Sequence, residues 1–543
     1  MKVAVSELIV GFMERLGIAH IFGMPGAHIL PVYDRLYDSQ IKSVLVKHEQ
    51  GAAFMACGYA RASGRIAACI ATAGPGATNM VTGIANAYAE KLPVLIVTGE
   101  TSTYIFGKGG LQESSGEGGS IDQASLFRDI TRYHKIVERT DYLAQVLRQA
   151  AKILLSPASG PVLLSFPYNV QKELVEDSLL DDIRYTPAAQ PICNRFAASA
   201  DMACMIVAAR HAVIVAGHGC FLAGAQAPLQ ALSAQRNIPV ATTLKAKGLG
   251  IENSPLALGC LGVTSDGKAF QHIAEHADLV IVLGASFNER TSYLWDARLL
   301  AGKQVIQIDH DDDQLEKVFK ADLAIRGDIR AVLEDVLQQL GDEGQASIPP
   351  APPHAPASVP PHFAVVAHFL AELVVRFPQG TQVFDDNIIL AQTYFKASPR
   401  HRYYPNTGIS SLGYAIPAAL GARCRVDTPT FAILGDGGFQ MCCMELMTAV
   451  NYQIPVNVVM INNGTLGLIR KNQFQLYRER YIDCDFVNPD YALLARSFGI
   501  KHWRIETTAD ADAMFERADL AGAINLIEIV WDKNVFPAYR SER

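Results

Sequence analysis

The chain has 543 residues, half of them apolar and 19% charged, with 47 basic against 54 acidic residues and a formal net charge of -7. At about 150 residues per domain, this length predicts three or four folded units and excludes one small module. The composition excludes general disorder, and the absence of a basic block argues against nucleic-acid binding. The ten cysteines contain no C-x-x-C pair, which indicates reduced thiols rather than a zinc or disulfide framework.

The first 17 residues carry apolar side chains at helical spacing, interrupted by Glu7, Glu14 and Arg15. This pattern predicts an amphipathic helix rather than a signal peptide. Nowhere in the sequence does an uninterrupted apolar run reach the roughly 18 residues that a membrane-spanning helix needs. We therefore expect no membrane partner and a cytoplasmic location.

Short apolar runs, many of them bounded by glycine, alternate along the chain with longer helical patterns. Such runs are typical of parallel strands that are buried on both faces. The sequence therefore predicts an α/β protein built from doubly wound parallel sheets rather than from one barrel. In chain order, the runs are 66–76, 92–100, 212–219, 277–287, 304–311, 430–438, 456–464 and 526–532.

Two seams divide this pattern into three α/β units of similar length. An acidic, turn-rich stretch interrupts the pattern at about 170–190, and a proline-dense segment at 347–361 is expected to form an extended linker. The predicted domains are residues 1–170, 190–345 and 362–543. In each of them, ligands are expected at the carboxyl ends of the strands.

The most specific motif lies in the third unit, where the sequence GDG (435–437) follows one predicted strand and NN (462–463) follows the next. Twenty-four residues separate the two motifs, which suits one strand–helix–strand crossover and brings both to the same edge of the sheet. Asp436 and Asn463 could there offer oxygens to Mg²⁺, while glycine amides at a helix start face a phosphate. Either motif alone is better explained as a turn, but together they favour a magnesium–diphosphate site.

This spacing resembles the diphosphate–magnesium motif of thiamine diphosphate enzymes, and the resemblance covers almost the whole chain. Near the amino terminus, IFGMPGAHILPVYDRL, VKHEQGAAFMACGYAR and TAGPGATN look like the pyrimidine-binding domain of the acetolactate synthase and pyruvate oxidase group. Near the carboxyl terminus, NTGISSLGYAIPAALGA, GDGGFQMCCMEL, NNGTLGLIR and LYRERY continue the match. The resemblance implies a pyrimidine-binding, a central and a diphosphate-binding domain, in that order.

The resemblance also implies roles for residues of the first unit. Glu49, in KHEQGAA, matches the family glutamate that hydrogen-bonds the N1′ atom of the aminopyrimidine ring and so activates the cofactor. Taken alone, Glu49 is explained equally well as a carboxylate at a helix start. Gln112 matches a glutamine that approaches the thiazolium ring and the substrate. Loops that line the pyrimidine and reaction pocket are matched by Gly26, Ala27, Gly74 and Gly76.

In the third unit, the resemblance implies a set of cofactor contacts. Leu412, in SSLGYAIP, matches the bulky apolar residue that props the cofactor into a bent shape, although an isolated leucine normally indicates core packing. Asp436, Asn463 and Thr465 are the implied magnesium ligands. The other expected cofactor contacts are Gly435, Gly437, Gly438 and Leu466.

The resemblance has a consequence for assembly, because in these families the glutamate and the diphosphate motif meet across a subunit interface. It therefore implies a homodimer or a homotetramer with active sites between subunits. The expected small-molecule partners are a 2-oxo acid and an acceptor carbonyl compound.

The implied reaction is acetolactate synthase-like: thiamine diphosphate- and Mg²⁺-dependent decarboxylation of a 2-oxo acid, followed by carboligation to the acceptor. The sequence has no His-His pair of the pyruvate decarboxylase type, which favours acyl transfer. Asn472 stands where the synthases usually have tryptophan, and their FAD-associated histidine–glycine turn is missing after LALGCLGVTSD, so FAD is doubtful. The alternatives are a non-oxidative 2-oxo acid decarboxylase, a 2-hydroxyacyl lyase, or a non-catalytic regulatory subunit of the same fold.

Overall fold

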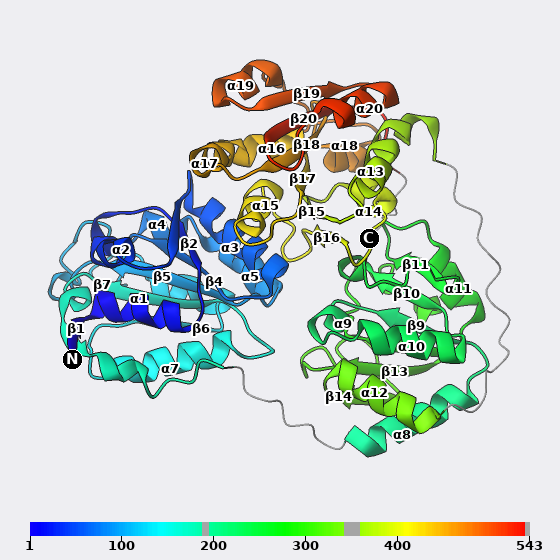
Figure 1. Cartoon of the computed structure of the whole chain (residues 1–543), viewed down its shortest axis with the longest axis horizontal. Coiled ribbons are helices and arrows are strands. Elements are labelled where there is room, and N and C mark those ends of the chain that lie inside the picture. Colours follow the sequence, from blue (N-terminus) through cyan, green and yellow to red (C-terminus); the bar gives the residue numbers. More distant parts are fainter. Residues whose placement is uncertain (187–194, 253, 342–358, 538–543) are drawn as a thin grey trace.

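The computed structural model describes residues 1–186, 195–252, 254–341 and 359–537. Three six-stranded parallel sheets form three α/β units, which confirms the predicted fold class. In Figure 1 the first unit (blue to cyan) and the central unit (green) lie below the third unit (yellow to red). Within the described residues, no helix combines the length and the apolar character needed to cross a bilayer.

The first unit has the strand order β3-β2-β4-β5-β7-β6. Its central strands β4 (Ala67–Ala71), β5 (Val94–Glu100) and β7 (Val162–Pro167) are buried along their whole length, because helices cover both faces of the sheet. The other elements of its sheet and its helical layers are α1 (Val5–Arg15), β2 (His20–Gly23), η1 (Ala27–Ile29), α2 (Leu30–Tyr37), β3 (Lys42–Leu45), α3 (Glu49–Ser63), α4 (Pro75–Thr78), α5 (Val81–Ala89), η2 (Thr103–Ile105), α6 (Gln123–Phe127), η3 (Arg128–Ile130), β6 (Tyr133–Ile136), α7 (Leu143–Leu154), η4 (Val170–Lys172) and η5 (Asp177–Leu180).

Helix α1 is the amphipathic helix that the sequence predicted, and a short strand precedes it. This strand, β1 (Lys2–Ala4), pairs antiparallel with β8 (Leu174–Glu176). Val175, Leu180 and Ile183 then join the core under α1. The described contacts therefore extend the first unit to Tyr185, which packs against Phe12 of α1, beyond the expected end at residue 170.

The central unit has the strand order β11-β10-β9-β12-β13-β14. Most of the predicted linker at 347–361 lies outside the described residues. The elements of this unit are α8 (Arg195–Ala208), β9 (Ala212–Ala216), α9 (Gly219–Leu222), α10 (Gln226–Arg236), β10 (Val240–Thr243), η6 (Leu244–Ala246), β11 (Ala257–Leu261), α11 (Lys268–His276), β12 (Leu279–Leu283), η7 (Ala297–Leu299), β13 (Gln304–Asp309), β14 (Leu323–Arg326) and α12 (Ile329–Leu340).

The third unit has the strand order β16-β15-β17-β18-β20-β19. Strands β17 (Thr430–Gly435) and β18 (Val456–Asn462) are parallel neighbours, so both end at one edge of the sheet. The remaining elements are η8 (Pro361–Phe363), α13 (Ala364–Arg376), β15 (Thr381–Asp385), α14 (Ile389–Tyr394), β16 (His401–Pro405), α15 (Ala415–Arg423), α16 (Asp436–Cys442), η9 (Cys443–Glu445), α17 (Leu446–Tyr452), α18 (Gly467–Leu476), α19 (Tyr491–Phe498), β19 (Lys501–Ile505), α20 (Thr508–Arg517) and β20 (Ile524–Val530).

The first and third units share one hydrophobic core, where α3 crosses α15 at backbone contact. A Cβ atom added at Gly58 would lie 1.9 Å from the carbonyl oxygen of Ala418, and one added at Gly421 would lie 1.9 Å from that of Met55. Glycine at both positions is therefore what lets the two backbones touch.

Candidate functional site

The GDG and NN motifs meet at the carboxyl ends of β17 and β18, as their spacing predicted. The buried carboxylate of Asp436 accepts hydrogen bonds through Oδ2 from the backbone N–H of Asn463 (3.0 Å) and of Gly464 (2.6 Å). Its Oδ1 accepts the N–H of Gly437 at 2.9 Å. Burial raises the pKa of Asp436, and the hydrogen bonds only partly offset this effect.

Asn488, which belongs to none of the sequence motifs, completes this arrangement. Its Nδ2 donates to Asp436 Oδ2 at 2.7 Å and to Asn462 Oδ1 at 2.8 Å. Its Oδ1 accepts from Gln440 Nε2 at 2.7 Å, so the amide group is held from three sides. Asn488 thus orients the carboxylate from a loop 52 residues further along the chain.

The other two expected magnesium ligands lie beside this carboxylate. Asn463 Oδ1 accepts the backbone N–H of Thr465 at 3.2 Å, and the hydroxyl of Thr465 donates to the carbonyl oxygen of Cys484 at 2.9 Å. Both oxygens keep lone pairs for a further partner. A carboxylate, an amide and a hydroxyl or carbonyl oxygen form the kind of donor set that a hard cation prefers.

A cavity of about 370 Å³ opens at this edge of the sheet. Glycine keeps its wall open, because a Cβ atom added at Gly437 would lie 2.7 Å from Leu466 Cδ2. Arg290 of the central unit also faces the cavity, and its Nη1 donates to Asn387 Oδ1 at 3.3 Å. Of the residues expected to contact the cofactor, the cavity wall contains Leu412, Gly435, Asp436, Gly437, Gly438, Asn463, Thr465 and Leu466.

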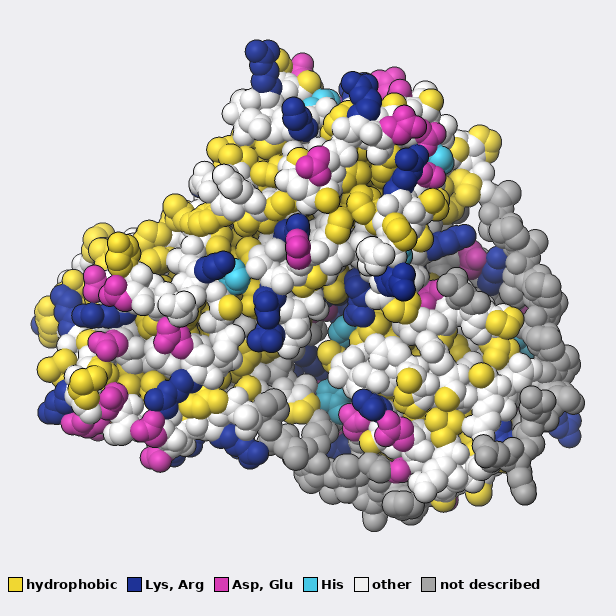
Figure 2. Space-filling view, viewed as in Figure 1, with side chains coloured by type: hydrophobic (Ala, Val, Ile, Leu, Met, Phe, Trp, Pro, Cys, Tyr) yellow, Lys and Arg dark blue, Asp and Glu magenta, His cyan; other side chains and the backbone are white. Residues whose placement is uncertain are grey.

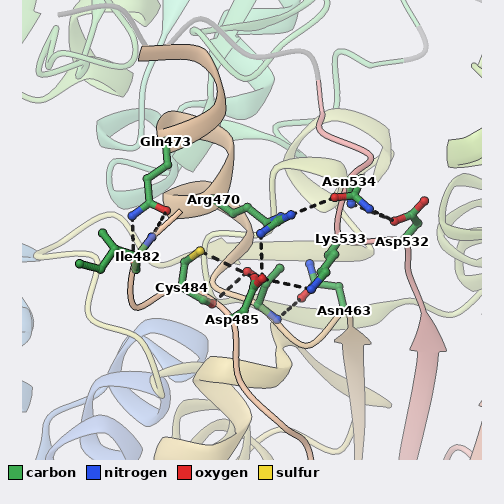
Figure 3. Close-up of polar contacts among 10 residues, drawn as sticks. Asn463, Arg470, Gln473, Ile482, Cys484, Asp485, Asp532, Lys533 and Asn534 are labelled. Carbon is green, nitrogen blue, oxygen red and sulfur yellow. Dashed lines mark hydrogen bonds and ion pairs between the residues drawn. The ribbon is translucent and has the colours of Figure 1, made fainter. Parts of the chain in front are cut away.

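The carboxyl-terminal segment 531–537 forms another wall of this cavity, and Asp485 ties it to the loop after β18. Figure 3 shows Asp485 between Arg470, Lys533 and the segment that carries Asn463. Asp485 Oδ2 accepts from Arg470 Nη1 at 2.8 Å and from Lys533 Nζ at 3.1 Å. This network holds helix α18 and the terminal segment against the candidate cation site.

The residues expected to face the pyrimidine ring form a separate cluster at the carboxyl edge of the first sheet. The buried Glu49 is the first residue of α3, and Asn79 Nδ2 donates to its Oε2 at 2.9 Å. A Cβ atom added at Gly76 would lie 3.6 Å from Glu49 Oε1, and one added at Gly26 would lie 2.5 Å from the side chain of Thr72. A side chain at Gly26 would therefore collide with Thr72, and one at Gly76 would lie against the carboxylate of Glu49.

Gln112 belongs to the same cluster, although its chain segment is an irregular loop. Its Oε1 accepts from Thr72 Oγ1 at 3.1 Å and lies 3.1 Å from Nδ1 of His28, the residue after Ala27. A Cβ atom added at Gly74 would lie 3.3 Å from Gln112 Cβ. The structure thus brings together all the site residues expected in the first unit, namely Gly26, Ala27, Glu49, Gly74, Gly76 and Gln112.

The glycine-rich stretch that carries this glutamine is held by a carboxylate of its own. Glu113 accepts the backbone N–H groups of Gly107, Gly109 and Gly110 at 2.6 to 3.0 Å, and the hydroxyl of Ser115 at 2.8 Å. These bonds, led by that from Gly107, lower the pKa of Glu113. Four donors of this loop therefore bind one carboxylate of the same loop, which stabilises its conformation beside the first cluster.

Within the described residues, the Glu49 cluster lies outside the cavity beside Asp436. Among the described residues, none that lines the cavity beside Asp436 belongs to the first unit. Near Glu49, the chain instead contacts η9: Glu445 Oε1 accepts the backbone N–H groups of Lys47 (3.0 Å) and His48 (3.1 Å). Asn472 is half-buried on α18, and the cavity does not include it.

Family models match the chain in all three units. The model of the thiamine pyrophosphate enzyme N-terminal TPP binding domain matches residues 3–124, that of the central domain matches 199–336, and that of the C-terminal TPP binding domain matches 387–529.

Curated relatives are similar over nearly the whole chain. A probable acetolactate synthase large subunit of Methanocaldococcus jannaschii is 32% identical, over 97% of this chain and 92% of the relative. The acetolactate synthase isozyme 2 large subunit of Escherichia coli K12 is 30% identical, over 98% of this chain and 96% of the relative. Among solved structures, a thiamine diphosphate-dependent 4-hydroxybenzoylformate decarboxylase of Rhodococcus jostii RHA1 has the same fold, with a TM-score of 0.85, 22% identity, and 99% and 100% of the two chains covered.

Proposed function

Because the chain belongs to the acetolactate synthase large-subunit family of thiamine diphosphate-dependent enzymes, we propose that it uses this cofactor with Mg²⁺ to decarboxylate a 2-oxo acid and to join the remaining acyl group to an acceptor carbonyl. The observation that carries the proposal is the meeting of Asp436, Asn463 and Leu412 around one cavity. A cation site, a diphosphate-sized opening and an apolar wedge are then available together.

Magnesium would be held by Asp436, Asn463 and Thr465. The raised pKa of Asp436 supports this assignment, because a bound cation would compensate a carboxylate that burial destabilises. The hydrogen bond from Asn488 keeps the carboxylate in place before the metal arrives. Gly437 and Gly438 would hold the diphosphate group through their backbone, because a Cβ atom would lie 2.7 Å from Leu466 Cδ2 at the first position and 3.0 Å from Asp386 Oδ2 at the second.

When bound, thiamine diphosphate would supply a nucleophilic carbon and an electron sink for decarboxylation. Glu49 would hold a proton between its carboxylate and the N1′ atom of the aminopyrimidine ring. The bond from Asn79 fixes Oε2, which leaves Oε1 on the side of Gly76 for this task. Leu412 would support the bend of the cofactor from the cavity beside Asp436.

The presence of Arg290 in the cavity wall favours a substrate that carries a carboxylate. Among the described residues, Arg290 is the cation that the central unit contributes to the cavity, and it donates to the neutral amide of Asn387. A guanidinium group recognises a carboxylate through two parallel hydrogen bonds.

In the proposed reaction, carbon dioxide would leave from the substrate. The substrate carbon that carried the carboxylate would bond to the carbonyl carbon of the acceptor, and the new alkoxide would take a proton.

A second copy of the chain would complete the active site. Glu49 and the cavity beside Asp436 are separate within one chain, so a partner subunit would bring one to the other. Figure 2 shows apolar side chains gathered where the first and third units meet. At this junction the exposed Tyr452 accepts the backbone N–H of the exposed Leu45 at 2.7 Å, and Met441 and Met444 of the third unit are also exposed. Such a patch supports burial against another subunit. A cytoplasmic location and doubtful FAD binding stay predictions of the sequence.

Calorimetric titration with thiamine diphosphate and Mg²⁺ tests the proposal, with Asp436→Ala as the control. We expect saturable binding that needs the metal and is lost in the variant. Absence of binding at millimolar cofactor would favour the alternative that the protein is a non-catalytic regulatory subunit of the same fold.

A screen of 2-oxo acid donors and aldehyde acceptors, read by mass spectrometry, then tests the reaction. Ligated hydroxyketone products support the proposal. Release of an aldehyde alone would favour the decarboxylase alternative.

A further inference from the structure

Leu412 forms part of the cavity wall and lies on a loop, outside the helices and strands. Residues 406–414 connect β16 to α15, and two of them, Ser410 (φ 56°) and Gly413 (φ 83°), have left-handed backbone conformations. The position of Leu412 therefore depends on what binds the loop.

The carboxyl group of Asp386 binds this loop at both ends. Asp386 follows β15, is 1% exposed, and forms part of the cavity wall. Its Oδ1 accepts from Asn406 Nδ2 at 2.9 Å, and its Oδ2 accepts the backbone N–H of Gly413 at 2.7 Å. Asn406 Nδ2 also donates to the carbonyl oxygen of Ser411 at 2.6 Å. One carboxylate thus sets the distance between the start of the loop and the residue after Leu412.

Asp386 also touches the segment expected to face the diphosphate. A Cβ atom added at Gly438 would lie 3.0 Å from Asp386 Oδ2. The backbone N–H of Asp386 donates to the carbonyl oxygen of Ile433 in β17 at 2.8 Å, so its own position is set by the sheet. The same residue therefore relates the loop of Leu412 to the start of α16.

We propose that Asp386 is a positioning residue that holds Leu412 at the depth in the cavity where it can support the bend of the cofactor. The inference rests on the proposed function, and it explains why a carboxyl group stands at this buried place. Both of its oxygens accept from N–H donors, so an isosteric amide would point its own N–H₂ at one of them.

Two further observations support this role. Burial raises the pKa of Asp386 to about 7, so the fold holds the carboxyl group there against a desolvation cost that an apolar side chain would not have. The tip of the loop has separate ties to the first unit, since Thr407 Oγ1 donates to Glu90 Oε1 at 3.1 Å. Loss of Asp386 should therefore loosen residues 411–413 while the tip stays attached.

The test compares Asp386→Asn with Asp385→Asn. Asp385 is equally buried, but its carboxylate accepts from Tyr403, Gln392 and the backbone N–H of Ile388, which all lie outside this loop. We expect Asp386→Asn to speed hydrogen–deuterium exchange of residues 411–413 about tenfold in the protein without cofactor. We also expect a 10- to 100-fold lower kcat with a smaller change in KM. Asp385→Asn should leave exchange in the loop unchanged.

Equal loop exchange in Asp386→Asn and the wild type, or unchanged kcat, would overturn the inference. If Asp386→Asn does not fold, Asn406→Ala removes one of the two bonds and should show the same loop signature more weakly; an unchanged loop there would also overturn the inference. Failure of the wild type to bind thiamine diphosphate would instead overturn the proposed function, and the exchange measurement distinguishes the two cases.

Discussion

Lys245 of the central unit donates to the carboxylate of Glu90 in the first unit, with 2.8 Å between Nζ and Oε2. The Glu90 side chain is 2% exposed, and its other oxygen accepts the hydroxyl of Thr407 from the third unit. Gly408 packs on the stem of Glu90, since an added Cβ there would lie 3.0 Å from Glu90 Cγ. One buried carboxylate therefore joins all three units.

Removal of this charge should destabilise the protein strongly. We expect Glu90→Gln to cost about 3 kcal/mol, because it leaves Lys245 partly buried and without its partner carboxylate. Urea unfolding followed by fluorescence measures the shift. As a control, Arg330→Ala breaks the exposed pair with Glu334 and should leave the unfolding midpoint nearly unchanged. Equal midpoints for Glu90→Gln and wild type would contradict the three-unit contact.

The same carboxylate predicts a pH dependence. Burial opposes ionisation of Glu90, but Lys245 and Arg61 outweigh this effect and lower its pKa from 4.5 to about 2. Because the pKa is lower in the folded state, the stabilisation is complete above pH 4.5 and is lost as the pH falls towards 2. The difference in unfolding midpoint between wild type and Glu90→Gln should therefore shrink over this range. A difference that stays constant from pH 5 to pH 3 would argue against an ionised Glu90.

The crossing of α3 and α15 should tolerate no side chain at Gly58. Gly58→Ala places a methyl group 1.9 Å from the carbonyl oxygen of Ala418, and we expect a loss of at least about 3 kcal/mol or a failure to fold. Gly327→Ala is the matched control, because its Cβ would meet only Val332 Cγ2 at 3.5 Å. Similar thermal unfolding of both variants would show that the helices can separate without cost.

Asn488 should control metal affinity rather than catalysis. Without its amide, Asp436 Oδ2 loses one of three hydrogen bonds, so we expect Asn488→Ala to raise the Mg²⁺ concentration for half-maximal cofactor binding by 10- to 100-fold. Turnover at saturating Mg²⁺ should largely recover. Calorimetry at several metal concentrations measures the shift, and an unchanged Mg²⁺ requirement would contradict a metal at Asp436.

Glu49 should act after the cofactor has bound. Glu49→Gln keeps the size of the side chain and can still accept from Asn79, so we expect near-normal cofactor affinity. Exchange of the thiazolium C2 proton, followed by NMR after acid quench, should slow by orders of magnitude, because an amide cannot hold the N1′ proton as a carboxylate does. A C2 exchange rate equal to that of the wild type would rule out this role.

Local pattern was enough to predict the three sheets, since apolar runs such as 92–100 and 277–287 contain the buried strands β5 and β12, and such runs are typical of strands covered on both faces. It was also enough to bring Asp436 to Asn463, because parallel strands joined by one crossover end at the same edge. These conclusions need only short-range periodicity and the handedness of the crossover.

Only the tertiary structure showed which side chains from distant parts of the chain hold the site residues in place. Asn488 and Asp386 lie on loops, and nothing in their neighbours distinguishes them from ordinary polar loop residues. Glu49 lies apart from the cavity and near Glu445 because of the way α3 crosses α15. This crossing depends on close backbone contact at two glycines. Contacts of this kind arise from the packing of whole units, so no local periodicity in the sequence records them.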